Sequence, residues 1–333
     1  MIPLSVLDLS PIVEGGDAGQ SLRSSAELAK AAERLGYTRF WMAEHHSMPG
    51  IASAATSVAL AYVGSQTSSI RIGAGGVMLP NHAPLTIAEQ FGTLESLYPG
   101  RIDLGLGRAP GTDQAAAYAL RRSLGTDADQ FPNDVVELAN YFKGQNGRVR
   151  AIPGEGLSIP IWILGSSLYG AQLAAMLGLP YAFASHFAPQ MMMEAIRVYR
   201  ERFEPSEQLD KPYVMLGFNV FAADTDEEAQ LLSTSIQQAV VALRTGQPMR
   251  LPPPQPGYAD SLPMQARAIL DNFLTCSAVG SPETVRRQVE AFVERTGADE
   301  LMVTSQIFDP AARIRSYELL MDAVRQREPA PAA

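Results

Sequence analysis

Residues 32–42, AERLGYTRFWM, contain the step that decides the fold: an amphipathic segment, a glycine and then a short apolar run. Gly36 stands where a helix ends on a left-handed residue, and a strand follows within about three residues. Gly178 and Gly297 hold the same place in AAMLGLPYAFA and VERTGADELMV. Variants of the step occur at residues 64–76 and 95–107. These repeated helix-to-strand steps predict a chain built from βα units.

Short apolar runs alternate with longer amphipathic ones along the chain. The expected strands are residues 4–9, 39–43, 70–75, 101–107, 160–165, 181–185, 213–222 and 300–305. The expected helices include residues 21–35, 84–97, 168–177, 189–203, 226–244 and 282–295. Eight such strands most often close into a barrel, whereas a doubly wound sheet carries a glycine-rich fingerprint after its first strand. Residues 10–21, SPIVEGGDAGQS, lack that fingerprint, so the sequence predicts an α/β fold, a (β/α)8 TIM barrel.

Two connections exceed the usual length for this fold. Residues 109–159 follow the fourth strand, and residues 246–263 follow the seventh helix. Long excursions in a compact barrel act as lids or binding loops, or are tolerated surface insertions. We expect one barrel domain over residues 1–333 that carries both insertions.

The composition excludes several classes of protein. Of 333 residues, 46% are hydrophobic and 18% charged, which is typical of a folded globular chain. The net charge of −9 offers no basic surface for nucleic acid. Cys276 is the single cysteine and the start of the sequence lacks a secretory signal, so we expect a cytoplasmic protein. The longest uncharged stretch, residues 47–70, is too polar to span a membrane.

Polar and small residues gather where the expected strands end, which is where barrels place their chemistry. All four histidines of the chain are among these residues, and two of them lie in the run Glu44-His45-His46. Each histidine could instead have a purely structural role and pack at the end of a strand. Imidazole and carboxylate could also bind zinc or iron, but Asp8 is the one acidic partner in a plausible place, so we expect no metal. The set comprises Glu44, His45, His46, Gly75, Gly76, Asn81, His82, Gly107, Arg108, Ser166, Ser167, Ser185, His186 and Gln306.

Two features point to a ligand with a phosphate and a flat ring. Ser166 and Ser167 follow an expected strand that ends at Gly165, and a helix begins at once. Free backbone N–H groups at such a helix start suit a phosphate, on which Arg108 could close with a bidentate fork. Plain N-capping by the serines explains them equally well. Gly75 and its glycine neighbours allow close approach of a flat ring at the third strand, while the glycines around residue 107 lack the dinucleotide spacing.

The residues named so far lie in motifs that resemble the bacterial luciferase-like family of flavin-dependent monooxygenases, most closely its small luciferase-family oxidoreductases (group 1 type). The motifs are FWMAEHH (40–46), IGAGGVMLPNHAPLTIAEQFGTLESLYPGRIDLGLGRAPG (72–111), LGSSLYGAQLAAMLGLP (164–180), FASHFAP (183–189) and VGSPETVRRQVEAF (279–292). The resemblance spans nearly the whole chain. It implies a barrel that binds FMN, whose reduced form reacts with O2 to a C4a-peroxide that oxygenates a small organic substrate.

The resemblance also implies roles for particular residues. His45 matches the active-site histidine and would act as the acid–base group, with Glu44 and His46 orienting it or shaping the pocket. Gly75 and Gly76 match a pair joined by a cis peptide beside the flavin ring. The expected cofactor-binding set is Gly75, Gly76, Met78, Gly107, Arg108, Gly165, Ser166, Ser167 and His186. Luciferases have a cysteine in place of Gly107 and an acidic residue in place of Ser166, so light emission is not expected.

Other functions stay open at this point. The family contains enzymes that transfer hydride with the deazaflavin F420, and a flavin could serve the same reaction. A metallohydrolase could use the histidines and Glu44, and relatives that bind flavin without catalysis also exist. The resemblance favours a homodimer and a separate flavin reductase as partners. The sequence does not name the small-molecule substrate.

Overall fold

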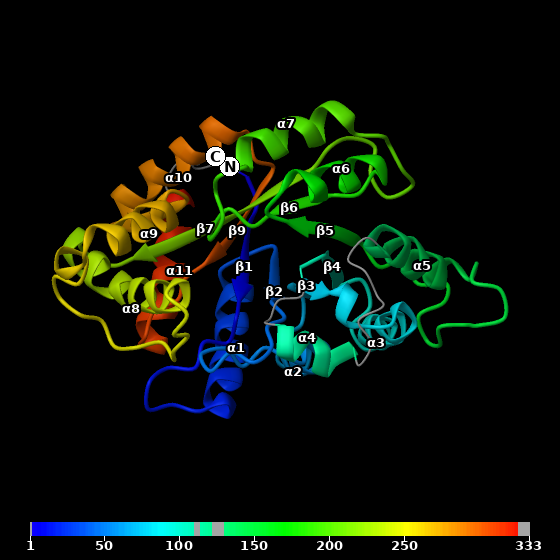
Figure 1. Cartoon of the computed structure of the whole chain (residues 1–333), viewed down its shortest axis with the longest axis horizontal. Coiled ribbons are helices and arrows are strands. Elements are labelled where there is room, and N and C mark those ends of the chain that lie inside the picture. Colours follow the sequence, from blue (N-terminus) through cyan, green and yellow to red (C-terminus); the bar gives the residue numbers. More distant parts are fainter. Residues whose placement is uncertain (1, 110–113, 122–129, 326–333) are drawn as a thin grey trace, which may run out of the picture.

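A computed structural model describes residues 2–109, 114–121 and 130–325, and its helices surround a central set of strands (Figure 1). The strands are β1 (Leu4–Asp8), β2 (Arg39–Met42), β3 (Arg71–Met78), β4 (Ile102–Gly107), β5 (Ile161–Gly165), β6 (Tyr181–Phe183), β7 (Val214–Ala222), β8 (Ser277–Gly280) and β9 (Glu300–Thr304). The helices are α1 (Ala18–Arg34), α2 (Thr56–Gln66), α3 (Pro84–Leu97), α4 (Gln114–Arg121), α5 (Phe131–Lys143), α6 (Leu168–Met176), α7 (Met192–Arg202), α8 (Asp226–Arg244), α9 (Met264–Leu274), α10 (Pro282–Thr296) and α11 (Pro310–Arg325).

The strands close into a parallel barrel. β1 pairs with β2 on one side and β9 on the other, and β7 completes the ring by pairing with both β6 and β9. Eight strands, β1 to β7 and β9, therefore form the barrel, and the predicted (β/α)8 fold is confirmed. Their largely apolar sequences suit strands that are buried on both faces.

One strand was missed by the sequence prediction. β8 pairs in parallel with Asn219–Ala222 of β7, beyond Val214–Leu216, which pair with β6. It extends the sheet outside the barrel. Its four residues, SAVG, alternate between half-buried and buried positions, and so short a run gives little sequence signal.

Glycine ends the helices as the sequence predicts. Gly36, Gly178 and Gly297 have φ values of +76°, +62° and +61°, the left-handed conformation that a helix end requires. Ser281 is the N-cap residue of α10 and Pro282 its first residue, also as predicted, but the serine side chain makes no capping hydrogen bond. These signals are local, which is why the sequence located them within one or two residues.

The two long connections contain more regular structure than expected. The connection after β4 holds α4 and α5, and a part of it lies outside the described residues. Residues 246–263 lead into α9, a helix that the sequence prediction missed, and then into β8. No described helix is long and apolar enough to cross a membrane.

Charged side chains close the amino-terminal end of the barrel. Asp103 is fully buried and accepts hydrogen bonds from Arg39, Arg71 and the indole N–H of Trp41. Glu300, also fully buried, accepts hydrogen bonds from Arg39, Ser5 and Tyr213. This arrangement leaves the carboxyl-terminal end of the barrel for a cavity.

Candidate functional site

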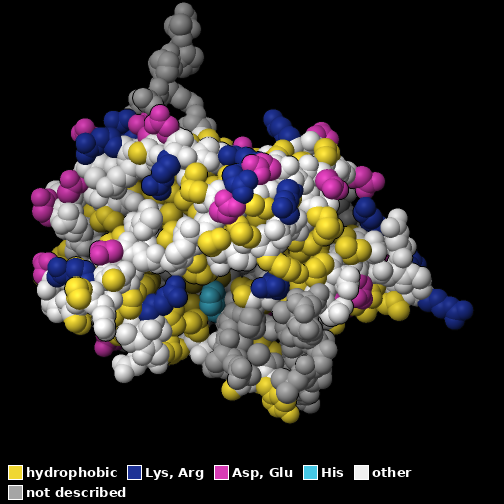
Figure 2. Space-filling model, turned by 45° about the horizontal axis from the view of Figure 1, so that its top comes forward, with side chains coloured by type: hydrophobic (Ala, Val, Ile, Leu, Met, Phe, Trp, Pro, Cys, Tyr) yellow, Lys and Arg dark blue, Asp and Glu magenta, His cyan; other side chains and the backbone are white. Residues whose placement is uncertain are grey.

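A cavity of about 1190 Å³ opens at the carboxyl-terminal ends of the strands. That volume exceeds the usual 300–1,000 Å³ of a small-molecule site, so it has room for a cofactor together with a substrate. All nine residues of the expected cofactor-binding set line this cavity, and so does His45. Glu44 and His46 do not belong to its described lining. Figure 2 shows a histidine side chain within a hollow of this molecule that basic side chains flank.

Glycines from neighbouring strands form one wall of the cavity. The peptide bond between Gly75 and Gly76 is cis, as the family resemblance implies. A Cβ atom at Gly76 would lie 2.7 Å from the carbonyl oxygen of Gly105, and one at Gly75 would lie 2.8 Å from Leu7 Cδ1. Both distances are shorter than real Cβ contacts; the obstacle at Gly76 is backbone, whereas at Gly75 it is the end of the Leu7 side chain, with Trp41 at 3.1 Å. The wall is therefore bare backbone that a flat ring can approach closely.

The start of α6 offers hydrogen-bond donors to the cavity. Ser167 is the N-cap residue, yet its side chain makes no capping hydrogen bond, so the N-capping alternative does not describe it. The guanidinium of Arg108 lies over the ring of Tyr169, 4.1 Å from its centre. Stacking on Tyr169 holds a cation beside the positive end of a helix, which is an arrangement suited to a phosphate. Tyr169 was not identified from the sequence.

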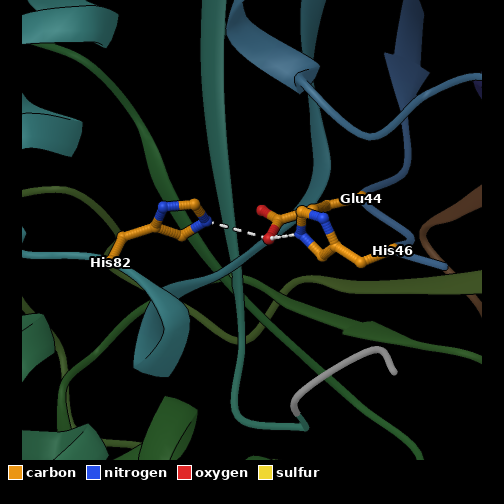
Figure 3. Close-up of side chains that lie close together, drawn as sticks. All are labelled: Glu44, His46 and His82. Atoms are coloured by element: carbon orange, nitrogen blue, oxygen red, sulfur yellow. Dashed lines mark hydrogen bonds and ion pairs between the residues drawn. The ribbon is translucent and has the colours of Figure 1, made fainter. Parts of the chain in front are cut away.

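Glu44 is the centre of a hydrogen-bonded cluster with two histidines. Its Oε1 atom lies 2.7 Å from Nε2 of His46 and 2.8 Å from Nε2 of His82, and Figure 3 shows the carboxylate between the two imidazoles. Its Oε2 atom accepts a hydrogen bond from the backbone N–H of Met78. Burial raises the pKa of Glu44, but the hydrogen bonds from His82, His46 and Met78 outweigh it, and the pKa lies below its ordinary value.

An ionised carboxylate only accepts hydrogen bonds, so both histidines must carry a hydrogen on Nε2. Glu44, His46 and His82 bring three possible ligand atoms within 4.8 Å of one another, and two of the contacts are hydrogen bonds from the imidazoles to the carboxylate. The cluster fits a fixed scaffold that joins the end of β2 to the segment after β3.

Glu44 thus does not orient His45 by a direct bond, contrary to one sequence expectation. The hydrogen bonds of Glu44 go to His46, His82 and Met78 in the segments that follow β2 and β3. His46 accordingly supports Glu44 behind the cavity wall. The residue brought to the cavity from this tripeptide is His45.

His45 and His186 line the cavity, and the Nδ1 atom of each is buried. In the described part of the chain, Nδ1 of either residue has no hydrogen-bond partner. Burial lowers the pKa of His45 below its ordinary value, against the opposing charge of Glu44. Burial, reinforced by His45, lowers the pKa of His186 to about 4. Both imidazoles are therefore neutral at pH 7 and can accept a proton.

A glycine inside β7 makes room for His186. A Cβ atom at Gly217 would lie 2.1 Å from Nδ1 of His186, so the imidazole packs directly on the strand backbone. Asn219, two residues further along the same face of β7, donates a hydrogen bond to the carbonyl oxygen of His186. The sequence analysis overlooked both residues. A lone glycine within the buried run VMLGFNVFA was the signal that could have located Gly217.

Three loops cover part of the cavity mouth and are joined by backbone hydrogen bonds. Ile12 donates to Gly50, Leu251 donates to Ile12, and Glu14 donates to Leu251. Leu251 belongs to the segment of residues 246–263 that the sequence analysis interpreted as a lid or an insertion. Gly50, Ile51, Met249 and Leu251 all line the cavity, so this cover is part of the site.

The fold and the site together define a (β/α)8-barrel enzyme whose cavity lies at the carboxyl ends of the strands. A family model described as luciferase-like monooxygenase matches residues 2–300. The chain belongs to the luciferase-like monooxygenase family, which confirms the resemblance seen in its motifs.

Relatives match over almost the whole chain. A luciferase-like monooxygenase of Escherichia coli (strain K12) is 53% identical over 323 residues, which are 96% of each chain. The N-acetyl-S-alkylcysteine monooxygenase of Bacillus subtilis (strain 168) is 33% identical over 97% of this chain and 98% of the relative. The crystal structure of apo-MsnO8 superposes with a TM-score of 0.88 at 37% identity, covering 98% of this chain and 99% of that one.

Proposed function

We propose that this protein is an FMN-dependent monooxygenase that uses reduced flavin and O2 to oxygenate a small organic molecule. One oxygen atom would enter the substrate, the other would leave as water, and the reduced flavin would be oxidised. The observation that carries the proposal is the continuity of one cavity from Arg108 at the start of α6, past the glycine wall, to His45. Such a lining offers a bare backbone wall to a flat ring and cationic and hydroxyl groups to a phosphorylated tail.

The residues present fit FMN in two ways. Ser166, Ser167 and Arg108 would hold the phosphate, because hydroxyls, helix N–H groups and a guanidinium are its usual partners. Gly75 and Gly76 would face the ring, where any side chain would collide with Gly105 or Leu7. Bound FMN would supply the electrons that activate O2. We favour FMN over the deazaflavin F420 because the family is one of monooxygenases, and a deazaflavin does not activate oxygen.

His45 would act as the acid–base group. Its pKa lies below the ordinary value because of burial, so the neutral imidazole can take up a proton on a free nitrogen. Nδ1 is buried without a partner in the described part of the chain. His186 would limit the cavity on the facing side, and the apolar lining and the loop cover would keep water away.

A separate reductase would supply the reduced flavin, and the protein would act as a homodimer.

The name of the Bacillus subtilis relative suggests the first substrates to test, N-acetylcysteines with alkyl groups on sulfur.

Anaerobic titration of the apo-protein with reduced FMN, oxidised FMN and F420 tests the cofactor assignment. We expect reduced FMN to bind most tightly, and oxygen uptake to begin when air is admitted with a substrate. Tight binding of F420 alone, with turnover that needs no oxygen, would instead identify a hydride-transfer enzyme.

The variant His45→Ala tests the assigned role of the histidine. General acid–base groups contribute about 10²- to 10⁴-fold to rate, so product formation should fall by that factor while FMN binding is retained. Unchanged oxygen uptake and product yield in the variant would show that His45 is not the acid–base group. Loss of activity to chelators, in a protein that never binds flavin, would identify a metalloenzyme.

A further inference from the structure

The charges that line the cavity differ from those of the whole protein. The chain has a net charge of −9, yet no described residue of the cavity lining is acidic. Two arginines line it, Arg108 and Arg244. Both imidazoles of the lining add further N–H groups but no negative charge. The cavity is therefore biased towards anions in an otherwise acidic protein.

The two arginines belong to different parts of the barrel. Arg108 directly follows β4, whereas Arg244 ends α8, the helix that follows β7 three strands further round. Arg108 has a role in the proposed function, because it lies at the helix start that suits the flavin phosphate. Arg244 is left without such a role, and a second cation in the cavity calls for a second anionic group.

Arg244 is held beside the site. One of its terminal nitrogens, Nη2, donates to the carbonyl oxygen of Phe187, the residue after His186, at 3.1 Å. No described carboxylate forms an ion pair with it, in contrast to Arg197 or Arg315 on the surface. A guanidinium has five N–H donors in a planar fork, so it retains donors for a carboxylate.

The part of the lining that α8, α9 and the loop cover contribute is largely apolar. Ile236 and Val240 of α8, Phe273 of α9 and Leu251 of the loop cover line this part of the cavity. Phe273 and Leu251 pack with Ile236 in one buried cluster. Such a lining binds a hydrocarbon body and repels uncompensated charge. The lining here also contains polar side chains: Asn272 of α9 is hydrogen-bonded to Gln190, and Gln265 of α9 is the third.

We propose that Arg244 binds the anionic group, a carboxylate, of a substrate whose remaining body is apolar. This inference rests on the proposed function, because it assigns the substrate class of the same cavity. The apolar body would lie along α8 and α9 and place its reactive end near the glycine wall and His45. Arg244 would thus determine specificity, and chemistry would stay with the flavin and His45.

The test compares carboxylic acids with their primary amides, which have nearly the same shape and no charge. Octanoate, 4-phenylbutyrate and N-acetyl-S-benzylcysteine are each paired with the amide. Binding is measured by calorimetry, with and without oxidised FMN. We expect at least one acid to bind the wild-type protein about tenfold more tightly than its amide, the worth of one charge-assisted hydrogen-bond pair.

Three variants locate the effect. Arg244→Met should abolish the preference for acids, and Arg244→Lys should retain a part of it. Arg250→Met is the matched control, because Arg250 is also exposed, donates to one carbonyl oxygen, that of Gly16, and does not line the cavity. It should keep the full preference. Raising the salt concentration should weaken the preference of the wild type, because Arg244 is exposed.

The proposal is overturned if no acid binds more tightly than its amide, or if Arg244→Met keeps the preference. It is also overturned if Arg250→Met loses as much as Arg244→Met. The cofactor assignment fails separately: flavin that does not bind leaves the acid and amide measurements on the apo-protein intact. An arginine that merely stabilises the end of α8 would lower thermal stability without changing the ratio of the two affinities.

Discussion

Two sets of buried polar groups, one at each end of the barrel, differ in how many hydrogen bonds they make. At the amino-terminal end, Asp103 and Glu300 are fully buried and each accepts several hydrogen bonds from charged or polar side chains. At the carboxyl-terminal end, His45 and His186 each keep a buried nitrogen without a partner in the described residues. Saturated groups hold a structure together, whereas a buried polar atom without a partner costs stability and is expected mainly at functional sites. The difference separates the stabilising end from the reactive end.

The largest loss of stability is expected when the hydrogen-bonded carboxylates at the amino-terminal end lose a member. Asp103→Ala removes the acceptor of four hydrogen bonds and leaves Arg71 without its carboxylate partner, whereas Arg39 keeps its pair with Glu300. Loss of one partner of a buried ion pair costs about 3–5 kcal/mol of unfolding free energy. Denaturant unfolding measures it. Asp224→Ala is the control, because Asp224 forms an exposed pair with Arg315 at 3.2 Å and should cost at most about 1 kcal/mol. Equal losses in the two variants would contradict the comparison.

The next effect concerns the dependence of stability on pH. His186 has a pKa of about 4 in the folded protein, against 6.5 ordinarily. The free energy of unfolding that depends on the protonation of His186 is fully present above pH 6.5. It is lost as the pH falls towards 4, because the unfolded chain binds the proton at a higher pH than the folded protein does. The loss amounts to at most about 3 kcal/mol. Unfolding of His186→Gln between pH 7.5 and pH 4 should therefore show a flatter decline than the wild type, and parallel curves would refute the assignment.

A smaller effect should distinguish binding of the flavin phosphate from binding of the flavin ring. Arg108→Met removes one charged partner of the phosphate, so affinity for FMN should fall about 10- to 100-fold. Riboflavin has the same ring without the phosphate, and its affinity should change little. Fluorescence quenching measures both constants. An equal loss for FMN and riboflavin would show that Arg108 does not bind the phosphate.

The smallest effect is expected at the loop cover. A Cβ atom at Gly50 would lie 2.4 Å from the carbonyl oxygen of Met249, so Gly50→Ala should push the two loops apart. Since loops can shift, the stability loss should stay near about 1 kcal/mol. Faster flavin dissociation in stopped flow is the sharper measurement. A dissociation rate identical to that of the wild type would mean that the cover does not limit access.

The sequence predicted those features that depend on neighbouring residues. The helices α3 and α8 begin and end at the predicted residues, and Gly36 ends α1 in the left-handed conformation. Capping and periodicity act over a few residues, so they can be read from a sequence directly. The expected cofactor-binding residues also line one cavity, because parallel strands bring their carboxyl ends to the same face of a barrel.

Other features depend on contacts between distant segments. Glu44 binds His82, 38 residues away, and the sequence could not rank that partner above the adjacent His45. Arg244 was overlooked because it lies at the end of a helix and not at the end of a strand. The strand β8 pairs only with the outer part of β7, so its own four residues gave no adequate signal. Such outcomes follow from tertiary packing, which overrides local preference.

The loops over the mouth are fastened through main-chain atoms, as in the bonds between Ile12, Gly50 and Leu251. Backbone hydrogen bonds do not depend on most side chains. The side chains of Met48, Ile51 and Met249, which line the cavity, can therefore be substituted while the hydrogen bonds between the loops remain. A library that randomises these three positions would diversify the part of the cavity lining under the loops without unfolding the protein. The same barrel could in this way acquire new specificities by evolution or in the laboratory.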